Sequence, residues 1–252
     1  MPESIYLQKN APIFEAIYGK GFISLGGAQA VHRLFDSVNI KNKLVLDIGC
    51  GLGGMLQLLA SKYGARGVGL DIHPWMSQYV SEASPALIKE RLRFLSYVPG
   101  EAFPIEDESI DLATSKGVFT NIKDKRAVFS EIKRVLKPAG ELLFVDWLVK
   151  DSVGQEVTVL DHGEPSFKES KSSYLALLND LGFNEISFEN ASKEYLGYIV
   201  QLDKLYKSKD HRQAYLTIID DKLRHMLIQA NEKLLESVKR EMVYSYKIRA
   251  SK

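Results

Sequence analysis

The fold of this chain is decided by the segment Leu44-Val45-Leu46-Asp47-Ile48-Gly49-Cys50-Gly51-Leu52-Gly53-Gly54, an apolar run that ends in glycines and leads into a helical pattern. Glycines at a strand–helix turn remove the Cβ atoms that would keep a ligand away from the backbone. The next apolar run, Gly67–Asp71, ends in an acid whose carboxylate can accept both hydroxyls of a ribose. Together the two segments predict a ribose-bearing cofactor at the carboxyl edge of a parallel sheet.

The glycine spacing separates two classes of cofactor. A dinucleotide-binding turn carries Gly-x-Gly-x-x-Gly and leaves room for a pyrophosphate on the helix N-terminus. Here the spacing is Asp-x-Gly-x-Gly-x-Gly, with Asp47 inside the motif. That carboxylate would repel a pyrophosphate and suits a ligand with a cationic amino-acid end. A dinucleotide-dependent oxidoreductase is therefore placed last among the candidate functions.

The composition is that of an ordinary globular chain without a strong electric field. Of 252 residues, 45% are hydrophobic, and 33 Lys and Arg balance 32 Asp and Glu, which predicts no attraction to nucleic acid. The lone cysteine, Cys50, excludes an internal disulfide and fits a reducing compartment. The first residues lack the features of a signal peptide, and no run has the length of a membrane span. We expect a cytoplasmic protein without stable membrane insertion.

The middle of the chain alternates strand-like and helical patterns. This alternation is typical of parallel strands joined by right-handed crossovers, with helices on both faces of the sheet. Lys137-Pro138-Ala139-Gly140 is expected to be a turn between a helix and the next strand. Strands are expected at 43–48, 67–71, 92–97, 110–115, 141–147 and about 185–189, and helices at 53–63, 74–82, 125–136 and 171–181.

Two regions lie outside this alternation. Residues 1–42 are expected to form an N-terminal helical lid, and residues 191–241 form a helical cap with one apolar face. Residues 242–252 alternate like a strand and are assigned as the last core strand. With residues 43–190 as the cofactor-binding core, the predicted fold is α/β and doubly wound, with a mostly parallel seven-stranded sheet.

The Asp-x-Gly-x-Gly-x-Gly turn resembles the first motif of class I S-adenosylmethionine-dependent methyltransferases. The segment Ile17–Gly27 resembles the lid region of phosphoethanolamine N-methyltransferases and related small-molecule methyltransferases, and Ala113–Asn121, Leu136–Gly140 and Phe144–Trp147 match that family in order. The similarity extends over nearly the whole chain. It implies a Rossmann-like fold, S-adenosylmethionine as the cofactor and a small molecule as the methyl acceptor.

The resemblance also implies the cofactor contacts. Lys116 stands where the family has an arginine near the cofactor. The third motif, Leu95–Glu101, lacks the aspartate that the family uses for the adenine amino group, so backbone acceptors around Tyr97 and Val98 would take its place. The expected cofactor-binding residues are Tyr6, Ile23, Ser24, Asp47, Gly49, Gly51, Asp71, Ile72, Tyr97, Val98 and Lys116.

The catalytic positions depart from the family. The family pairs a tyrosine of the N-terminal helix with a histidine after the fourth strand; Tyr6 matches the tyrosine, Asn121 occupies the histidine position, and Gly117 replaces an aspartate that contacts the substrate amine. Asparagine can orient a ligand but cannot titrate near neutral pH. His162, in the insert after the fifth strand, is therefore a further candidate base. Tyr6, Asn121 and His162 are the expected catalytic residues, although Asn121 also fits a helix cap and Tyr6 a packed aromatic residue.

The phosphate-binding positions of the family are replaced as well. Glu164 and Ser166 fall where the family has an arginine and a tyrosine, and Leu234 falls at a lysine. An acid and an aliphatic residue in place of cations disfavour a phosphate dianion. Phe119, Trp147 and Glu164 are expected to form an aromatic, mildly acidic acceptor pocket.

No metal site is predicted. The five histidines include no pair at i, i+4 spacing, and Asp161-His162-Gly163-Glu164 is a single short loop without a second histidine. The oligomeric state cannot be predicted from the sequence.

The leading hypothesis is a methyltransferase that acts on a small molecule, with N-methylation favoured over O-methylation and phosphoethanolamine disfavoured. A first alternative keeps the chemistry but changes the acceptor to an apolar, lipid-like molecule or a natural product. A second alternative is a non-catalytic domain that binds S-adenosylmethionine and regulates or scaffolds another protein.

Overall fold

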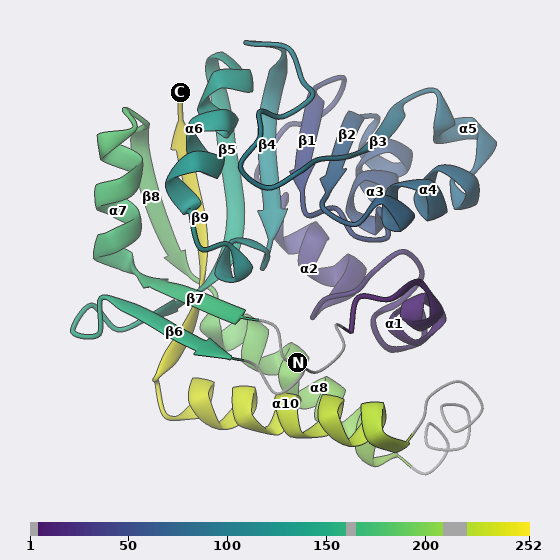
Figure 1. Cartoon of the computed structure of the whole chain (residues 1–252), viewed down its shortest axis with the longest axis vertical. Coiled ribbons are helices and arrows are strands. Elements are labelled where there is room, and N and C mark those ends of the chain that lie inside the picture. Colours follow the sequence, from purple (N-terminus) through teal and green to yellow (C-terminus); the bar gives the residue numbers. More distant parts are fainter. Residues whose placement is uncertain (1–4, 160–164, 209–220) are drawn as a thin grey trace.

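The computed structural model describes residues 5–159, 165–208 and 221–252, and their central feature is a sheet of nine strands (Figure 1). The strands are β1 (Leu44–Ile48), β2 (Arg66–Asp71), β3 (Leu92–Ser96), β4 (Ile110–Lys116), β5 (Leu136–Val149), β6 (Gln155–Val159), β7 (Pro165–Ser170), β8 (Asn184–Asn190) and β9 (Val243–Ser251). The α-helices are α1 (Ala11–Tyr18), α2 (Gly27–Leu34), α3 (Gly54–Tyr63), α4 (Pro74–Ala83), α5 (Ala86–Lys89), α6 (Lys125–Val135), α7 (Lys171–Asp180), α8 (Ser192–Lys207) and α10 (Asp221–Lys239). Two short 3-10 turns are η1 (Gln8–Asn10) and η2 (Phe119–Asn121).

The strand order confirms the predicted doubly wound fold. Strands β3, β2, β1, β4 and β5 pair in parallel in that order, and β9 then pairs antiparallel to β5 on one side and to β8 on the other. The order reverses between β1 and β4, where an open α/β sheet leaves a crevice at the carboxyl ends of its strands. The glycine-rich turn after β1 opens into this crevice.

Alternating side chains of the central strands cover both faces of the sheet. On β5, Leu142 and Phe144 pack with α6 and α7, whereas Leu143 and Val145 pack with α2 and α3. A strand points successive side chains to opposite faces, so a strand with a helical layer on each side must be apolar throughout. This explains why the central strands are continuous apolar runs in the sequence.

The ends of several helices follow from local sequence. Asp124 caps α6 by accepting a hydrogen bond from the Ala127 N–H at 3.0 Å, and Ser170 caps α7 in the same way through the Ser173 N–H. Pro74 begins α4, where a missing N–H leaves no helical bond unmade. Gly64 ends α3 in the left-handed conformation.

Two differences from the prediction concern β5 and the strands after it. The expected turn at Lys137–Gly140 lies within β5: Leu136 already pairs with Ile110, and the register then shifts through a bulge. The sheet also has nine strands rather than seven, because β6 and β7 form an antiparallel hairpin whose second strand pairs with the end of β5. Polar residues interrupt both hairpin strands, so their sequence carries only a weak strand pattern.

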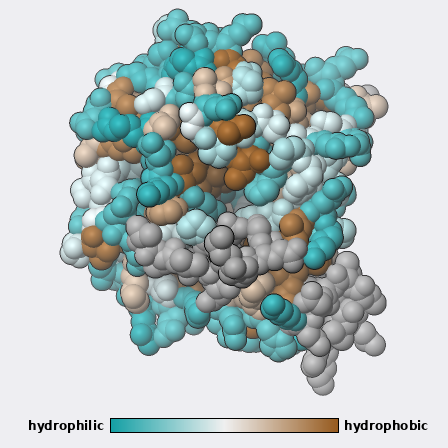
Figure 2. Space-filling view, in the orientation of Figure 1, coloured by the Kyte–Doolittle hydropathy of each residue, from teal (hydrophilic) through white to brown (hydrophobic). Residues whose placement is uncertain are grey.

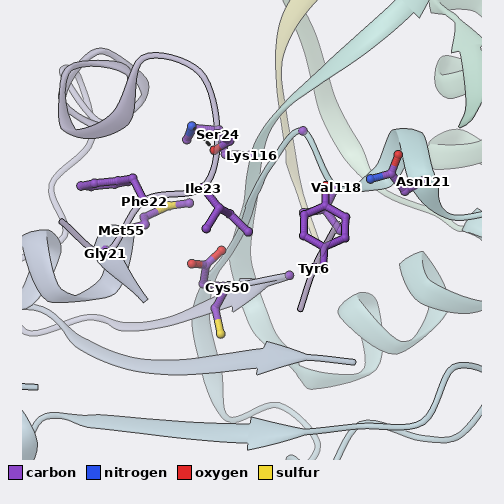
Figure 3. A pocket seen from close by; sticks show the side chains of 14 residues that line it. Tyr6, Gly21, Phe22, Ile23, Ser24, Cys50, Met55, Lys116, Val118 and Asn121 are labelled. Atoms are coloured by element: carbon purple, nitrogen blue, oxygen red, sulfur yellow. Dashed lines mark hydrogen bonds between the residues drawn. The ribbon is translucent and has the colours of Figure 1, made fainter. Parts of the chain in front are cut away.

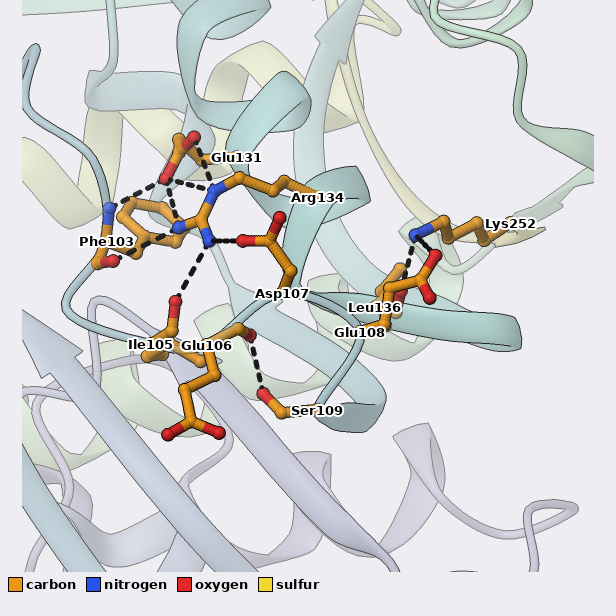
Figure 4. Close-up of polar contacts among 10 residues, drawn as sticks. All are labelled: Phe103, Ile105, Glu106, Asp107, Glu108, Ser109, Glu131, Arg134, Leu136 and Lys252. Atoms are coloured by element: carbon orange, nitrogen blue, oxygen red, sulfur yellow. Dashed lines mark hydrogen bonds and ion pairs between the residues drawn. The ribbon is translucent and has the colours of Figure 1, made fainter.

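The loop between β3 and β4 is fixed to α6 by one arginine (Figure 4). The Arg134 guanidinium pairs with Glu131 and with Asp107, and donates to the carbonyls of Phe103 and Ile105. Glu131 in turn accepts the Phe103 N–H at 2.7 Å. The Phe103 ring packs edge-on against Tyr97 at 5.2 Å, so this ion-pair cluster positions the start of the loop next to the crevice.

The remaining elements gather near the carboxyl ends of the parallel strands. Figure 1 shows α1, α8, α10 and the β6–β7 hairpin on this side of the sheet. Helices α8 and α1 share an apolar cluster that includes Ile13, Ile17, Leu202 and Leu227. Within the described ranges, no helix combines the length and apolar character that crossing a membrane requires.

Candidate functional site

The turn after β1 forms the floor of a cavity at the crevice. Gly49 and Gly51 adopt left-handed backbone angles, with φ of 70° and 52°. A Cβ on Gly49 would lie 2.4 Å from Val118, and one on Gly51 would lie 2.6 Å from Ile23. Glycine is therefore needed at both positions for the conformation and for the close approach of neighbouring segments.

The cavity has two connected parts that share Tyr6, Ile23, Gly49, Val118 and Asn121. The first part, of about 80 Å³, reaches Ser24, Asp47 and Lys116, and the second, of about 180 Å³, reaches Asp71, Tyr97 and Pro165. Figure 3 shows the first part, with Ser24 and Lys116 at one end and Tyr6 and Asn121 at the other. In the space-filling view of Figure 2, hydrophobic residues gather around the centre of the face seen in Figure 1.

Asp71 closes the turn from the end of β2. Its Oδ2 accepts the Gly51 N–H at 2.9 Å, and its Oδ1 accepts the His73 N–H at 3.0 Å and the His73 Nδ1–H at 2.9 Å. An ionised carboxylate only accepts hydrogen bonds, so the Nδ1 of His73 carries the hydrogen. Asp71 thus holds the glycine turn in place while its carboxylate faces the cavity.

A buried acid and a buried lysine face each other at the other end. Burial raises the pKa of Asp47 from 3.8 to about 8, with the nearby Asp71 charge adding to the rise and Lys116 opposing it. Burial likewise lowers the pKa of Lys116 from 10.5 to about 8, against the attraction of Asp47. Among the residues that the structure describes, the buried Asp47 Oδ1 has no hydrogen-bond partner. A buried acceptor of this kind, beside a cavity, is suited to a cationic donor on a ligand.

Lys116 also holds the segment between α1 and α2. Its Nζ donates to Ser24 Oγ at 2.5 Å and to the Leu25 carbonyl at 2.9 Å. Gly21 is tied to the β1 turn at the same time, because its carbonyl accepts the Gly54 N–H at 2.8 Å. The segment expected to act as a lid therefore lies against the glycine turn and the end of β4.

The outer wall of the second part is apolar. Ile72 is 47% exposed beside Asp71, and Tyr97 lines the same part of the cavity. Burial raises the pKa of Tyr97 to about 12, with the Asp71 charge a smaller cause. Val98 is 57% exposed and is not part of the lining of either cavity. An apolar wall beside a strand-end acid is suited to a flat base.

Asn121 lies at the opposite wall, on the η2 turn after β4. A buried network fixes this turn: Asp146 accepts the N–H and the hydroxyl of Thr120 at 3.0 and 2.6 Å, and the Tyr174 hydroxyl at 2.5 Å. Burial raises the pKa of Asp146, against the effects of these hydrogen bonds and of Lys125. The network leaves Val118 and Asn121 facing the cavity.

Two residues of the expected acceptor pocket lie elsewhere. Phe119 is fully buried and packs against Phe129 and Phe144 at 4.7 and 5.0 Å, so its assignment to the pocket wall is corrected: the η2 turn directs its ring into the core. Trp147 is half-buried, packs edge-on against Tyr195 of α8 at 5.5 Å, and belongs to neither described cavity.

His162, predicted as a catalytic residue, and Glu164, predicted to line the acceptor pocket, lie outside the described residues. Within the described part of the chain, no group of three or more His, Cys, Asp or Glu side chains is arranged to hold a metal ion. Burial raises the pKa of the Cys50 thiol well above its ordinary value, so this cavity-lining cysteine is not a thiolate nucleophile.

The structure brings most of the expected cofactor residues to one cavity. The expected cofactor-binding residues that line it are Tyr6, Ile23, Ser24, Asp47, Gly49, Asp71, Ile72, Tyr97 and Lys116. Gly51 and Val98 are not among the lining residues, and Asn121, an expected catalytic residue, is. The cavity is also lined by residues that were not predicted as site residues, among them Val118, Met76, Ile122, Pro165 and His73. His73 directly follows Asp71 and Ile72 in the sequence. This position next to two predicted cofactor-binding residues was the signal that could have identified it as a lining residue.

Comparison with known proteins agrees with this geometry. Residues 46–144 match a family model described as a methyltransferase domain. The chain is 28% identical over 201 residues to phosphoethanolamine N-methyltransferase 1 of Zea mays, covering 78% of this chain and 40% of that protein. It is 34% identical over 152 residues to the sarcosine/dimethylglycine N-methyltransferase of Halorhodospira halochloris, covering 58% of this chain and 53% of that protein.

The fold is shared with a solved relative. The structure of Haemonchus contortus phosphoethanolamine N-methyltransferase 2, in complex with phosphomonomethylethanolamine and S-adenosylhomocysteine, superposes with a TM-score of 0.83 at 20% identity and covers 98% of this chain and 58% of that one. The chain thus spans about two fifths of the plant relative and under two thirds of the nematode one.

Residues 46–144 thus carry a methyltransferase domain, and the relatives that the chain resembles in sequence and in fold are named as methyltransferases. The predicted methyltransferase class, the fold and the similarity to the phosphoethanolamine N-methyltransferase group are confirmed, and the expected cofactor is the one whose demethylated product is bound in the solved relative. The roles assigned to individual residues stay predictions.

Proposed function

We propose that this protein transfers a methyl group from S-adenosylmethionine to a nitrogen of a small acceptor that carries no phosphate. The observation that supports this most strongly is a single cavity lined by a strand-end acid, a glycine turn, a buried carboxylate and a buried lysine. Two features fit the cofactor: the glycine floor that a Cβ would fill, and the buried Asp47 Oδ1 that has no partner.

Each polar group has a defined task toward the cofactor. Asp71 accepts the ribose hydroxyls, while Ile72 and Tyr97 enclose the adenine. Asp47 accepts from the ammonium group, and Lys116 with Ser24 pairs with the carboxylate. The ammonium also stabilises the ionised form of Asp47, whose pKa burial otherwise raises to about 8.

The reaction demands little acid–base chemistry from the protein. S-adenosylmethionine supplies a methyl group already activated on a sulfonium, so alignment and exclusion of water contribute most of the rate. A neutral amine attacks with its own lone pair and releases its proton afterwards. Asn121 is placed to orient such an acceptor through its amide, and Tyr6 covers the cavity from the N-terminal segment. Neither role requires a residue that titrates at the histidine position of the family.

The charges at the cavity argue against a phosphorylated acceptor. Among the described lining residues, Lys116 is the one Lys or Arg; two of its Nζ–H groups bond to Ser24 and Leu25, and the proposal assigns the third to the cofactor carboxylate. The nearby buried Lys125 is bonded to the Ile122 and Phe167 carbonyls, and lies 3.8 Å from Glu169. A phosphate dianion would add charge beside Asp47 and Asp71, and the described lining residues offer no further cation to pair with it.

The acceptor is therefore a small amine such as an amino acid. The relative named for sarcosine and dimethylglycine is consistent with this proposal, since those acceptors are amines without a phosphate. An apolar acceptor is the second candidate, because Val118, Ile122 and Pro165 form an apolar wall on the Asn121 side. A non-catalytic role in binding S-adenosylmethionine is the third reading.

The test is a transfer assay with methyl-labelled S-adenosylmethionine and a panel of acceptors. The panel contains unphosphorylated amines, phosphoethanolamine, and phenols with quinones as the apolar arm. We expect label in an amine and none in phosphoethanolamine. Efficient turnover of phosphoethanolamine would contradict the proposal, label confined to the apolar arm would favour the second candidate, and binding without any transfer would favour the non-catalytic reading.

A further inference from the structure

The turn between β2 and α4 connects the ribose acid to the N-terminal segment. His73 in this turn bonds to Asp71 through both its backbone N–H and its Nδ1–H. The His73 ring packs against the Tyr6 ring, with centroids 5.7 Å apart and an interplanar angle of 49°. Both rings line the same part of the cavity.

Trp75, two residues further along the chain, anchors the backbone of the same N-terminal segment. Its indole N–H donates to the Tyr6 carbonyl at 3.1 Å. The Trp75 and Tyr6 side chains also pack around an apolar cluster of Ile5, Ala11, Phe14 and Leu52. Tyr6 is therefore held from two sides: its ring packs against His73, just before α4, and its backbone carbonyl accepts a hydrogen bond from Trp75 in α4.

The hydrogen bonds at Asp71 make this arrangement sensitive to the ribose. A carboxylate has about four acceptor positions, and the Gly51 N–H and the two His73 donors fill three of them. Both acceptor positions of Oδ1 belong to His73. A ribose whose two hydroxyls engage both oxygens must displace or share the Nδ1–H bond, and the His73 ring then changes its position against Tyr6.

We propose that His73 is a positioning residue that couples occupancy of the ribose site to the placement of Tyr6, and that Trp75 is the fixed anchor of the N-terminal segment. This inference rests on the proposed function in one respect, that the ribose of S-adenosylmethionine binds at Asp71. The anchoring by Trp75 is a property of the protein without ligand.

Substitutions at His73 separate its two contacts. His73→Phe keeps an aromatic ring against Tyr6 but loses the Nδ1–H bond to Asp71. Trp75→Phe keeps an aromatic ring at position 75 but loses the hydrogen bond to the Tyr6 carbonyl. His32→Phe is a matched control, because the His32 ring also packs against a tyrosine, Tyr63, at 6.1 Å, and lines none of the described parts of the cofactor cavity.

The first readout is hydrogen exchange over residues 5–18, with and without S-adenosylmethionine. In the free protein, Trp75→Phe should raise exchange at residues 5–10 severalfold, and His32→Phe should not. On cofactor addition, the unmodified protein and His32→Phe should gain protection, and His73→Phe should show less than half of that gain. A full gain in His73→Phe would overturn the coupling, and unchanged exchange in Trp75→Phe would overturn the anchor.

The second readout is fluorescence. The chain has two tryptophans, so Trp147→Phe leaves Trp75 as the sole reporter of the segment. Adenosine, which carries the ribose, should change Trp75 emission in this background, and methionine alone should not. Adding His73→Phe should remove the adenosine response; an intact response would contradict the coupling.

The failure of each claim is distinguishable. If the unmodified protein binds neither S-adenosylmethionine nor adenosine, the proposed function and the coupling both fail, while the exchange of Trp75→Phe in the free protein still decides the anchor. If the cofactor binds and His73→Phe responds like the unmodified protein, the coupling alone fails.

Discussion

The two halves of the cavity are built differently. The half that we propose to hold the cofactor contains Asp47, Gly49, Gly51 and Asp71, all within two neighbouring strand–turn units, and backbone geometry fixes their positions. The half that we propose to hold the acceptor combines Tyr6, Asn121 and Pro165, which come from distant segments, and the buried Asp146 network fixes the turn that carries Asn121. A cofactor site made from local turns can be recognised in a sequence, whereas an acceptor site assembled by tertiary packing has no short motif.

The largest effect on cofactor binding is expected from removing Asp71, the acid that we propose to bind the ribose. Asp71→Ala loses the ribose contacts and also releases the Gly51 N–H and His73, so we expect about 100-fold weaker binding of S-adenosylmethionine, or roughly 3 kcal/mol. Isothermal titration measures the loss. The matched control is Asp111→Asn at the opposite edge of the sheet, where Asp111 accepts the Leu44 N–H at 2.7 Å. The control should bind the cofactor normally; equal affinity of Asp71→Ala would refute the ribose assignment.

A substitution in the Asp146 network should lower the free energy of unfolding and leave the cofactor affinity nearly unchanged. Tyr174→Phe removes one bond to the buried Asp146 and leaves that acceptor under-satisfied, so we expect a loss of roughly 1–3 kcal/mol of unfolding free energy. Cofactor affinity should change by less than about threefold, or roughly 0.7 kcal/mol, because the network holds η2 and not the glycine turn. Chemical denaturation and titration on the same sample test this, and a large drop in affinity would show that the two halves are not separable.

Substitutions at Lys116 test whether this residue binds the carboxylate of S-adenosylmethionine. Lys116→Met removes the cation and the bonds to Ser24 and Leu25, so we expect about tenfold weaker S-adenosylmethionine binding, near 1.4 kcal/mol. Lys116→Arg should restore most of the affinity because it returns a charged donor. Affinity for adenosine, which lacks the carboxylate, should be nearly unchanged in both variants. A similar loss for adenosine would assign Lys116 a structural role only.

A further expected effect is on stability and depends on pH. The folded-state pKa of Asp47 is raised from 3.8 to about 8, so the protonated form is favoured in the folded protein and stability is lost as the pH rises through this range. Asp47→Asn removes this loss: its stabilisation of the free protein should grow between pH 4 and pH 8 and then level off. Thermal unfolding across pH measures it, and a pH-independent difference would contradict the assigned pKa shift.

The sequence predicted the fold well because its signals are local and repeated. The runs that became β1 and β2 are nearly continuous in apolar residues, as strands buried on both faces are, and their boundaries differ from the prediction by one residue. The β6–β7 hairpin was missed because polar residues interrupt both strands and the pairing depends on the end of β5.

The acceptor side resisted prediction for physical reasons. Whether Phe119 or Val118 faces the cavity depends on the direction of the η2 turn, which the hydrogen bonds between Thr120 and Asp146 decide. These residues are far apart in the sequence, and no spacing rule connects them. His73 was considered only as a metal ligand, because its contact with Tyr6 requires two segments to meet in space.

The most direct test of the central claim is a pair of titrations on the unmodified protein, one with S-adenosylmethionine and one with NAD. The two ligands share an adenosine, so the comparison isolates the amino-acid end that Asp47 and Lys116 are proposed to bind. We predict saturable binding of S-adenosylmethionine at one site per chain and no saturable binding of NAD. Binding of NAD with equal or higher affinity, or no binding of S-adenosylmethionine, would contradict the account.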